Sequence, residues 1–350
     1  MTERVLSTRE LNRALLARQL LLERSRLALT RALERVAGLQ TQYAPSAYVA
    51  LWSRLHDFRR ETLTRALEQR RAVQATLMRA TIHIVSAGDY PLFAAAIRNS
   101  RREWWARVQR HQVEGLDMSK VAALLRKHLA DGPQRQAELT QLLQAEGFPR
   151  IAWSGAGMWL DLVRVPPSGT WEQRRADLYG LADDWLGRTK STETEGLQHL
   201  VRRYLGGNGP ASLNDVASWA GLQITTVRPV VERLGLRRFR DERGGELLDL
   251  PQAPLPDPDT PAPVRFLPTW DATLLVHARR TQILPEPYRP LVFDTKTPHS
   301  VSTFLVDGAV AGKWRYERGH VRLEPFGPLP RSTRTELEDE AERLSAFHAE

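Results

Sequence analysis

A chain of 350 residues is long enough to form two or more domains with buried cores. It contains no cysteine, which excludes disulfides, thiolate catalysis and zinc sites that include cysteine. Lys and Arg number 50 against 41 Asp and Glu, and the formal charge of +9 favours polyanionic partners, unless it only reflects an arginine-rich proteome. With no signal-peptide pattern and no apolar run of about 18 residues, we expect a cytoplasmic, nucleoid-associated protein that has no membrane partner.

The first region, residues 1–118, predicts helices that lead into a hairpin. Ser7-Thr-Arg-Glu10 has the spacing of a capping box, and leucines follow it at helical intervals. Pro45 disfavours a helical conformation at the residue before it, so a new helix is expected from about Ser46. The expected elements are helices over 7–22, 26–38, 46–55 and 61–69 and an alternating, β-branched hairpin over 72–86.

The rest of the chain predicts two more groups of helices, each followed by two strands, and then a β-rich module. A stretch with six prolines, 251–263, is expected to be a stiff extended linker. After it, 264–350 contains an Asp307-Gly308 hairpin signal and ends in a helix capped by Thr333-Arg-Thr-Glu336. The two groups are 119–190, with helices over 120–130, 135–145 and 154–162 before a Pro/Gly turn, and 191–250, with helices near 195–205, 212–220 and 225–235 before a hairpin with a Gly-Gly tip.

One spacing occurs three times, in Leu29–Leu39, Leu139–Gly147 and Leu213–Leu222. Each copy begins with Leu and then Thr or Asn, runs for about two helical turns and reaches Gly. A second amphipathic run and a short basic, strand-like piece follow each copy. The order helix, turn, helix, wing predicts an α+β fold of tandem winged helices, one in each of the regions 1–118, 119–190 and 191–250, and a chain suited to lie along a nucleic-acid duplex.

Gln40 and Gln42 are the pair with the clearest chemical potential. On a continuous helix, residues two apart point in nearly opposite directions, but here the helix is expected to end just before them. A non-helical turn can direct both carboxamides at one point. Matching Leu39-Gln40 with Leu222-Gln223 places the pair at the turn of a helix-turn-helix, which faces the duplex. By itself a Gln-x-Gln is a weak motif, and its position alone favours a polar turn or a phosphate contact over catalysis.

Other residues are candidates for DNA binding. Arg79, Thr81 and His83 have even spacing on an expected strand and would share one face, which either lines a cleft or packs in the core. The expected third wing carries Arg237, Arg238, Arg240 and Arg243, and a second patch has Lys313 and Arg315 beside Trp314. Trp104-Trp105 fits core packing better than base stacking, and Asp271 is either a remote electrostatic group or a turn cap.

Two sequence blocks resemble the AlkZ/YcaQ family of winged-helix DNA glycosylases. They are Val36-Ala-Gly-Leu-Gln-Thr-Gln42-Tyr-Ala-Pro-Ser-Ala-Tyr48 and Leu77-Met-Arg-Ala-Thr81-Ile-His83, with further likeness in Phe266-Leu-Pro-Thr-Trp-Asp271 and Leu305–Arg315. The resemblance implies tandem winged helices in a C-shaped arrangement and a catalytic role for Gln40 and Gln42. One branch of the family has Gln-x-Gln and the other Gln-x-Asp, so this chain resembles the AlkZ branch, whose members unhook interstrand crosslinks made by alkylating natural products. Its middle residue, Thr41, is polar where the motif often has an apolar residue.

The resemblance implies a monomeric, monofunctional glycosylase without a cofactor or metal, whose partner is double-stranded DNA with alkylated purines. Its substrate would be a cationic N7-alkylguanine, or an N3-alkyladenine, including bulky and crosslinked adducts. The sequence has no Gly-rich phosphate loop and no His-Glu-x-x-His motif. The alternative hypothesis is a DNA-binding protein without activity, either a transcriptional regulator or a resistance protein that sequesters lesions.

Overall fold

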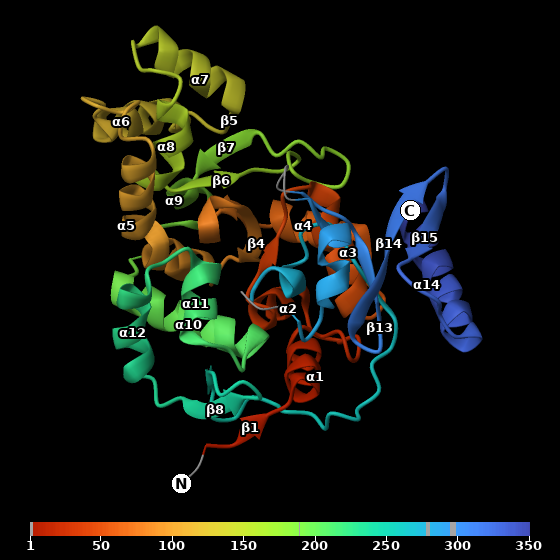
Figure 1. The fold of residues 1–350 in the computed structure, drawn as a ribbon. Coiled ribbons are helices and arrows are strands. Elements are labelled where there is room, and N and C mark those ends of the chain that lie inside the picture. Colours follow the sequence, from red (N-terminus) through yellow and green to blue (C-terminus); the bar gives the residue numbers. More distant parts are fainter. Residues whose placement is uncertain (1–2, 189, 278–280, 295–298) are drawn as a thin grey trace.

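The computed structural model describes residues 3–188, 190–277, 281–294 and 299–350, which form a mixed α+β fold (Figure 1). Its α-helices are α1 (Thr8–Arg18), α2 (Leu29–Arg35), α3 (Ala44–Arg54), α4 (Arg60–Glu68), α5 (Tyr90–Val108), α6 (Met118–Leu129), α7 (Gln136–Ala145), α8 (Ala152–Trp159), α9 (Ala182–Leu186), α10 (Glu193–Asn208), α11 (Leu213–Ala220), α12 (Ile224–Glu232), α13 (Arg289–Val292) and α14 (Arg331–Ala349), and its 3-10 helices are η1 (Met78–Ala80), η2 (Ala272–Leu274) and η3 (Glu286–Tyr288). Its strands are β1 (Val5–Leu6), β2 (Leu39–Gln40), β3 (Ala72–Thr76), β4 (Ile82–Ser86), β5 (Gln134–Arg135), β6 (Leu162–Arg164), β7 (Leu178–Leu181), β8 (Arg237–Asp241), β9 (Glu246–Asp249), β10 (Arg265–Leu267), β11 (Phe293–Asp294), β12 (His299–Ser300), β13 (Thr303–Val306), β14 (Ala309–Glu317) and β15 (His320–Pro325).

The same order of elements recurs in three parts of the chain. In the first, α2 is followed by β2, then α3 and α4, then the hairpin β3–β4. In the second, α6 is followed by β5, then α7 and α8, then β6 and β7. In the third, α10 leads to a single bridge between Ala211 and Leu248, then α11 and α12, then the hairpin β8–β9. We refer to these parts as the first, second and third units.

Two of the units share one sheet. Its strand order is β2-β4-β3-β6-β7-β5, and β3 pairs with β6 antiparallel, with Ala75 opposite Val163. The third unit has its own sheet, β1-β8-β9, in which the N-terminal strand runs parallel to β8. The C-terminal residues form a four-stranded sheet, β10-β13-β14-β15, with α14 packed against it. In Figure 1 this module lies at the opposite end of the molecule from α6 and α7.

Aromatic side chains connect the parts through two shared cores. Phe93 of α5, the helix that follows the first unit, packs against Trp219 of α11, and the same core contains Val73 and Val85 of the β3–β4 hairpin, so it joins the first and third units. Tyr48 of α3 lies in a cluster with Phe266 and Phe347, which joins the first unit to the C-terminal module. Burial of each such aromatic side chain stabilises the fold by about 2–3 kcal/mol. The second unit has a separate core around α6 and α8.

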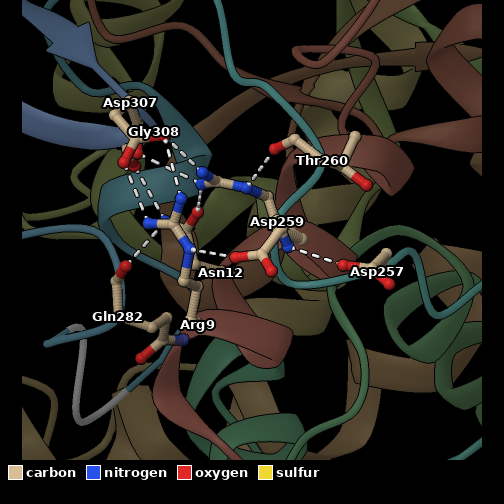
Figure 2. A network of polar contacts seen from close by, with 9 residues as sticks. Arg9, Asn12, Asp257, Asp259, Thr260, Gln282, Asp307 and Gly308 are labelled. Carbon is tan, nitrogen blue, oxygen red and sulfur yellow. Dashed lines mark hydrogen bonds and ion pairs between the residues drawn. The ribbon is translucent and has the colours of Figure 1, made fainter.

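Helix α1 holds distant segments together through buried arginines. Arg18 and Asp249 of β9 are both fully buried and joined at 2.6 Å. The buried Arg13, in the middle of the helix, pairs with Asp307 in the β13–β14 turn, and the partly exposed Arg9 of the first turn pairs with the same carboxylate (Figure 2). Figure 2 also shows Asn12 with contacts to the same turn and to the chain near residue 282. A buried arginine needs such partners because an uncompensated charge in the interior is costly.

Several expected boundaries are wrong. The helices predicted over 7–22 and 26–38 are only α1 and α2 as bounded above, because Leu20 and Ala37 adopt left-handed conformations that end each helix early. Helix α3 begins at Ala44 and not near Ser46, since Pro45 falls in the first turn, where a missing N–H costs little. The last helix begins after Pro330, ahead of the predicted cap.

The threefold spacing is also out of register with the units. Its copy at Leu29–Leu39 covers α2, the first helix of the first unit. The copies at Leu139–Gly147 and Leu213–Leu222 cover α7 and α11, which are the second helices of their units. Matching Gln40 with Gln223 was therefore wrong, because Gln40 lies on a strand and Gln223 precedes α12. Within the residues that the structure describes, no helix is both long and apolar enough to cross a membrane.

Candidate active site

The backbone before Gln40 makes a sharp turn from helix to strand. Ala37 and Gly38 both have positive φ angles, 62° and 80°. A Cβ on Gly38 would lie 2.7 Å from Val85 Cγ1, so glycine is needed both for the conformation and for the close approach to β4. Strand β2 then pairs with β4, with Gln40 directly opposite His83. The pair of glutamines therefore lies at the edge of the shared sheet, and not at the helix-turn-helix turn predicted from the sequence.

Both carboxamides have their oxygens held by donors of the protein. Gln40 is buried, and its Oε1 accepts a hydrogen bond from Arg79 Nη2 at 2.6 Å. Gln42 is exposed, and its Oε1 accepts from the backbone N–H of Ile82 at 2.8 Å. Guanidinium and backbone N–H groups only donate, so both amides are oriented with the oxygen toward β4 and its preceding turn. The structure thus places both glutamines near the start of β4, each with its carboxamide oxygen held by a separate donor.

Arg79, Thr81 and His83 do not share one strand face. Arg79 belongs to η1, the turn between β3 and β4, and has a left-handed φ of 52°. Thr81 ends this turn, and its hydroxyl donates to the Met78 carbonyl at 2.9 Å. Only His83 lies in β4. The even spacing predicted one continuous strand from Arg79 to His83. In the structure a tight turn takes the place of the first part of that strand, and this turn directs Arg79 toward Gln40.

His83 is a buried, neutral histidine. Burial lowers its pKa to about 3, and the nearby positive charges of Arg79 and Arg101 act in the same direction. Its Nδ1 lies 3.0 Å from the Thr81 carbonyl, so this nitrogen carries the proton and donates it. His83 therefore supports the strand beneath Gln40 as a hydrogen-bond donor and offers no charge for contact with DNA phosphate.

A groove begins at Tyr43, the residue after Gln42. It has a volume of about 410 Å³ and lies between α3, the β6–β7 loop and the C-terminal module. From that loop, Arg174 donates to the Tyr43 hydroxyl at 2.8 Å and lies over the Trp171 ring. Tyr316 and Arg315 line the far side. The sequence analysis missed Trp171 and Arg174, whose only signal was an aromatic and two arginines in a Pro/Gly-rich loop.

The arginines of the third hairpin differ in their roles. Arg237 bonds to the buried carboxylate of Asp249 at 2.8 Å and to the Ala253 carbonyl, so it is a structural residue. Arg238 pairs with Glu246, and Arg240 with Glu3 at 2.9 Å. Arg243 is exposed at the tip of the hairpin. Of the four, Arg243 is best placed to contact a polyanion.

The remaining candidates are placed as follows. Lys313 and Arg315 lie on β14 and both pair with Glu324 of β15, at 3.1 and 3.5 Å. Trp105 is buried in the core of the second unit, whereas Trp104 is largely exposed, so core packing holds for only one of the two tryptophans. Asp271 is a turn cap, since it accepts from the Thr273 N–H at the start of η2.

The groups at this site are polar, and among those named here only Arg79 carries a charge. The site offers two carboxamides, one neutral imidazole and an arginine whose charge faces Gln40. Across the described part of the chain, no three His, Asp or Glu side chains are grouped closely enough to hold a metal ion. The arrangement can hold a water molecule and stabilise developing positive charge through carboxamide dipoles.

Comparisons with known proteins show the family of the chain and a likeness of its fold. A family model described as "DNA glycosylase AlkZ-like" matches residues 33–347. A solved structure, the DNA glycosylase AlkZ of Streptomyces sahachiroi, is similar with a TM-score of 0.81 over 99% of this chain and 97% of its own, at 19% sequence identity, which is a likeness of fold. A search of the curated proteins found no match. Because the family model covers most of its length, the chain belongs to the family of AlkZ-like DNA glycosylases.

Proposed function

We propose that the chain is a monofunctional DNA glycosylase that releases cationic alkylated purines, above all N7-alkylguanine, and leaves an abasic site. Bulky and interstrand-crosslinked adducts are included in this substrate class, and N3-alkyladenine is a second one. The observation that carries the proposal is that Gln40 and Gln42 each have their carboxamide oxygen held by a donor at the start of β4 or in the turn before it, in a chain of this family.

The proposed step is hydrolysis at C1′ of the deoxyribose. The bond between C1′ and N9 breaks, its electron pair neutralises the alkylated base, and water adds to C1′ and loses a proton to solvent. Each carboxamide oxygen has two lone pairs, and the protein uses one of them on each oxygen. The second lone pair can accept a hydrogen bond from the attacking water, and the same dipoles favour the cationic sugar of the transition state.

The absence of a strong base in this pair defines the substrate. Carboxamides do not accept a proton at neutral pH, and His83, opposite Gln40 on β4, is buried and neutral. The site therefore relies on a base that is already a good leaving group because alkylation has made it cationic. Because the glutamines would hold the attacking water at C1′, the base can stay in the duplex during hydrolysis. This matters for a crosslinked base, which cannot be rotated out of the duplex.

In this proposal the three units form the frame that holds duplex DNA. Each has the element order of a winged helix, with two strands after its third helix. In this proposal the units surround the duplex in a C-shaped arrangement, the exposed Arg243 and the Arg315 patch contact phosphates, and a single chain suffices. Affinity should then fall about linearly in log salt concentration, with a slope set by the number of phosphates contacted.

The experiment is base release from a duplex that contains one N7-methylguanine, measured with enzyme in excess of DNA. Wild type should produce an abasic site, and Gln40→Ala and Gln42→Ala should each slow this step by about tenfold to a thousandfold, as loss of one oriented polar group does elsewhere. Gln144→Ala, an exposed glutamine on α7, is the matched control and should have no effect.

The same experiment with a neutral base tests the leaving-group argument. Hypoxanthine at the same position should be released far more slowly than N7-methylguanine. If wild type binds the duplex but releases neither N7-methylguanine nor a bulkier N7-alkylated guanine, the chain is a DNA-binding protein without glycosylase activity, and the proposal is wrong.

A further inference from the structure

We infer that Arg79 is a positioning residue that holds the Gln40 carboxamide in its reactive orientation and connects it to the third unit. The inference rests on the proposed function, since it assigns Gln40 a role in base release. The distances are short: Arg79 Nη2 lies 2.6 Å from Gln40 Oε1, and Nη1 lies 2.9 Å from the carbonyl of Trp219. One planar guanidinium thus bridges a side chain of the first unit and the backbone of α11.

The hydrogen bond from Arg79 fixes which of its two orientations the Gln40 amide adopts. A glutamine side chain can rotate its amide by half a turn, which exchanges the oxygen and the nitrogen at little steric cost. With Arg79 in place, the reversed orientation would direct the NH₂ of Gln40 at a group that can only donate. Arg79 therefore selects one orientation, and it leaves the second lone pair of Oε1 in a defined direction for water.

The backbone around Arg79 is built to hold this position. Arg79 and Ala80 both have positive φ angles, 52° and 56°, which non-glycine residues adopt only where the surroundings require it. On the other side, Gly221 ends α11 in a left-handed conformation with φ of 73°. A Cβ on Gly221 would lie 3.1 Å from the Arg79 backbone nitrogen, so the two turns are in direct contact.

The positive charge of Arg79 is partly offset by the carbonyl end of helix α11. A full positive charge near C1′ would oppose an oxocarbenium-like transition state. The Trp219 carbonyl lies at the C-terminal end of α11, where the helix dipole is negative, and it accepts from the same guanidinium. The contact with α11 therefore serves two purposes: it positions Arg79, and it reduces the effect of its charge on the neighbouring site.

This assignment differs from a direct contact with DNA, the role for which the sequence made Arg79 a candidate. A phosphate-binding arginine contributes to affinity whatever residue 40 is. A positioning arginine contributes to the rate of base release, and only while Gln40 is present. The two roles are separated by measuring binding and single-turnover release for the same set of variants.

The test is a double-mutant cycle with Arg79→Ala and Gln40→Ala on the N7-methylguanine duplex. Arg79→Ala should slow release by about tenfold or more while binding changes by less than about twofold, since orientation and not affinity is lost. In the Gln40→Ala background, Arg79→Ala should have no further effect on the rate. Equal slowing by Arg79→Ala in both backgrounds, or release by Arg79→Ala at the wild-type rate, would overturn the inference.

A chemical rescue distinguishes positioning from a general structural role. Millimolar guanidinium should partly restore release by Arg79→Ala, and should restore nothing in the double variant; sodium at equal ionic strength is the control. Arg79→Lys keeps the charge but cannot make both planar contacts, so it should release base more slowly than wild type, and it serves if Arg79→Ala fails to fold. If wild type itself releases no base, the proposed function fails; if wild type is active and the cycle is additive, only the inference about Arg79 fails.

Discussion

Breaking the ion pair between Arg54 and Asp271 on one side only should strongly destabilise the fold, and Asp271→Asn is the change that tests this. Both side chains are almost completely buried, and two hydrogen bonds of 2.9 Å join them. Burial alone would raise the pKa of Asp271, but the Arg54 charge and hydrogen bonds from Thr273 outweigh it and hold the pKa below its usual value. Asparagine keeps the size of the side chain and removes the charge, so Arg54 is left buried without compensation.

The size of the effect follows from the cost of such a charge. Removing one partner of a buried ion pair costs about 3–5 kcal/mol. Unfolding entropy of about 2.1 cal/mol/K per residue gives about 0.7 kcal/mol/K for 350 residues that unfold as one unit, so the Tm should fall by about 4–7 °C. Replacing both residues, as in Arg54→Leu with Asp271→Leu, should recover part of the loss, because the unpaired charge is then absent.

The assay is thermal unfolding at pH 7, followed by tryptophan fluorescence, with Asp339→Asn as the control. Asp339 is exposed on α14, so its substitution should change the Tm by about 1 °C or less. Two results would contradict this reasoning: unfolding of Asp271→Asn at the wild-type temperature, or a double variant that is less stable than Asp271→Asn. Either one would show that the substitution does not leave a costly unpaired charge on Arg54. The site should respond too, because Arg54 ends the helix that begins two residues after Gln42.

Three further outcomes follow from the structure. Gly38→Ala should destabilise the protein by more than about 1 kcal/mol in urea unfolding and slow base release, because its φ of 80° is unfavourable for alanine and the added methyl meets Val85; unchanged values for both would contradict the described turn. His83 has a folded pKa of about 3 against an ordinary 6.5, so the unfolded chain binds the extra proton and stability falls as the pH decreases through that window, by about 2 kcal/mol at pH 5. In unfolding titrations His83→Gln should lack this part of the loss between pH 7 and pH 5, and an equal loss in both proteins would show that His83 titrates normally. Arg243→Ala should weaken duplex binding and reduce the salt slope by about 1 without changing the Tm, whereas Arg237→Ala should lower the Tm because Asp249 loses a buried partner; the reverse pattern would assign the phosphate contact to Arg237.

Features that depend on neighbouring residues were predictable from the sequence. The capping box of Ser7 and Glu10 is present, because its two hydrogen bonds lie within one turn. The Asp307-Gly308 turn and the hairpin β8–β9 are also present, since turn residues and alternation report local backbone conformation. The family resemblance correctly identified the family, whereas the convergence of Gln40 and Gln42 on one reacting point stays a prediction.

Features that depend on distant residues were not predictable. Strand β2 has only two residues, too few for a periodicity, so Gln40 could not be distinguished from a residue in a turn. The pairing of β3 with β6, nearly ninety residues later, is set by packing between units and leaves no local signal. Arg237 was indistinguishable in sequence from an exposed wing arginine, because its partner, Asp249, is recognised as buried only in the fold.

The most direct test of the central claim is the release of N7-methylguanine by wild type and by Gln42→Ala, with duplex affinity measured for both proteins in the same buffer. Gln42 is exposed, so its substitution should leave the Tm and the Kd unchanged. The account predicts an abasic product with wild type and release slowed by about tenfold or more with Gln42→Ala. Equal release by the two proteins would show that the glutamine pair is not the catalytic site.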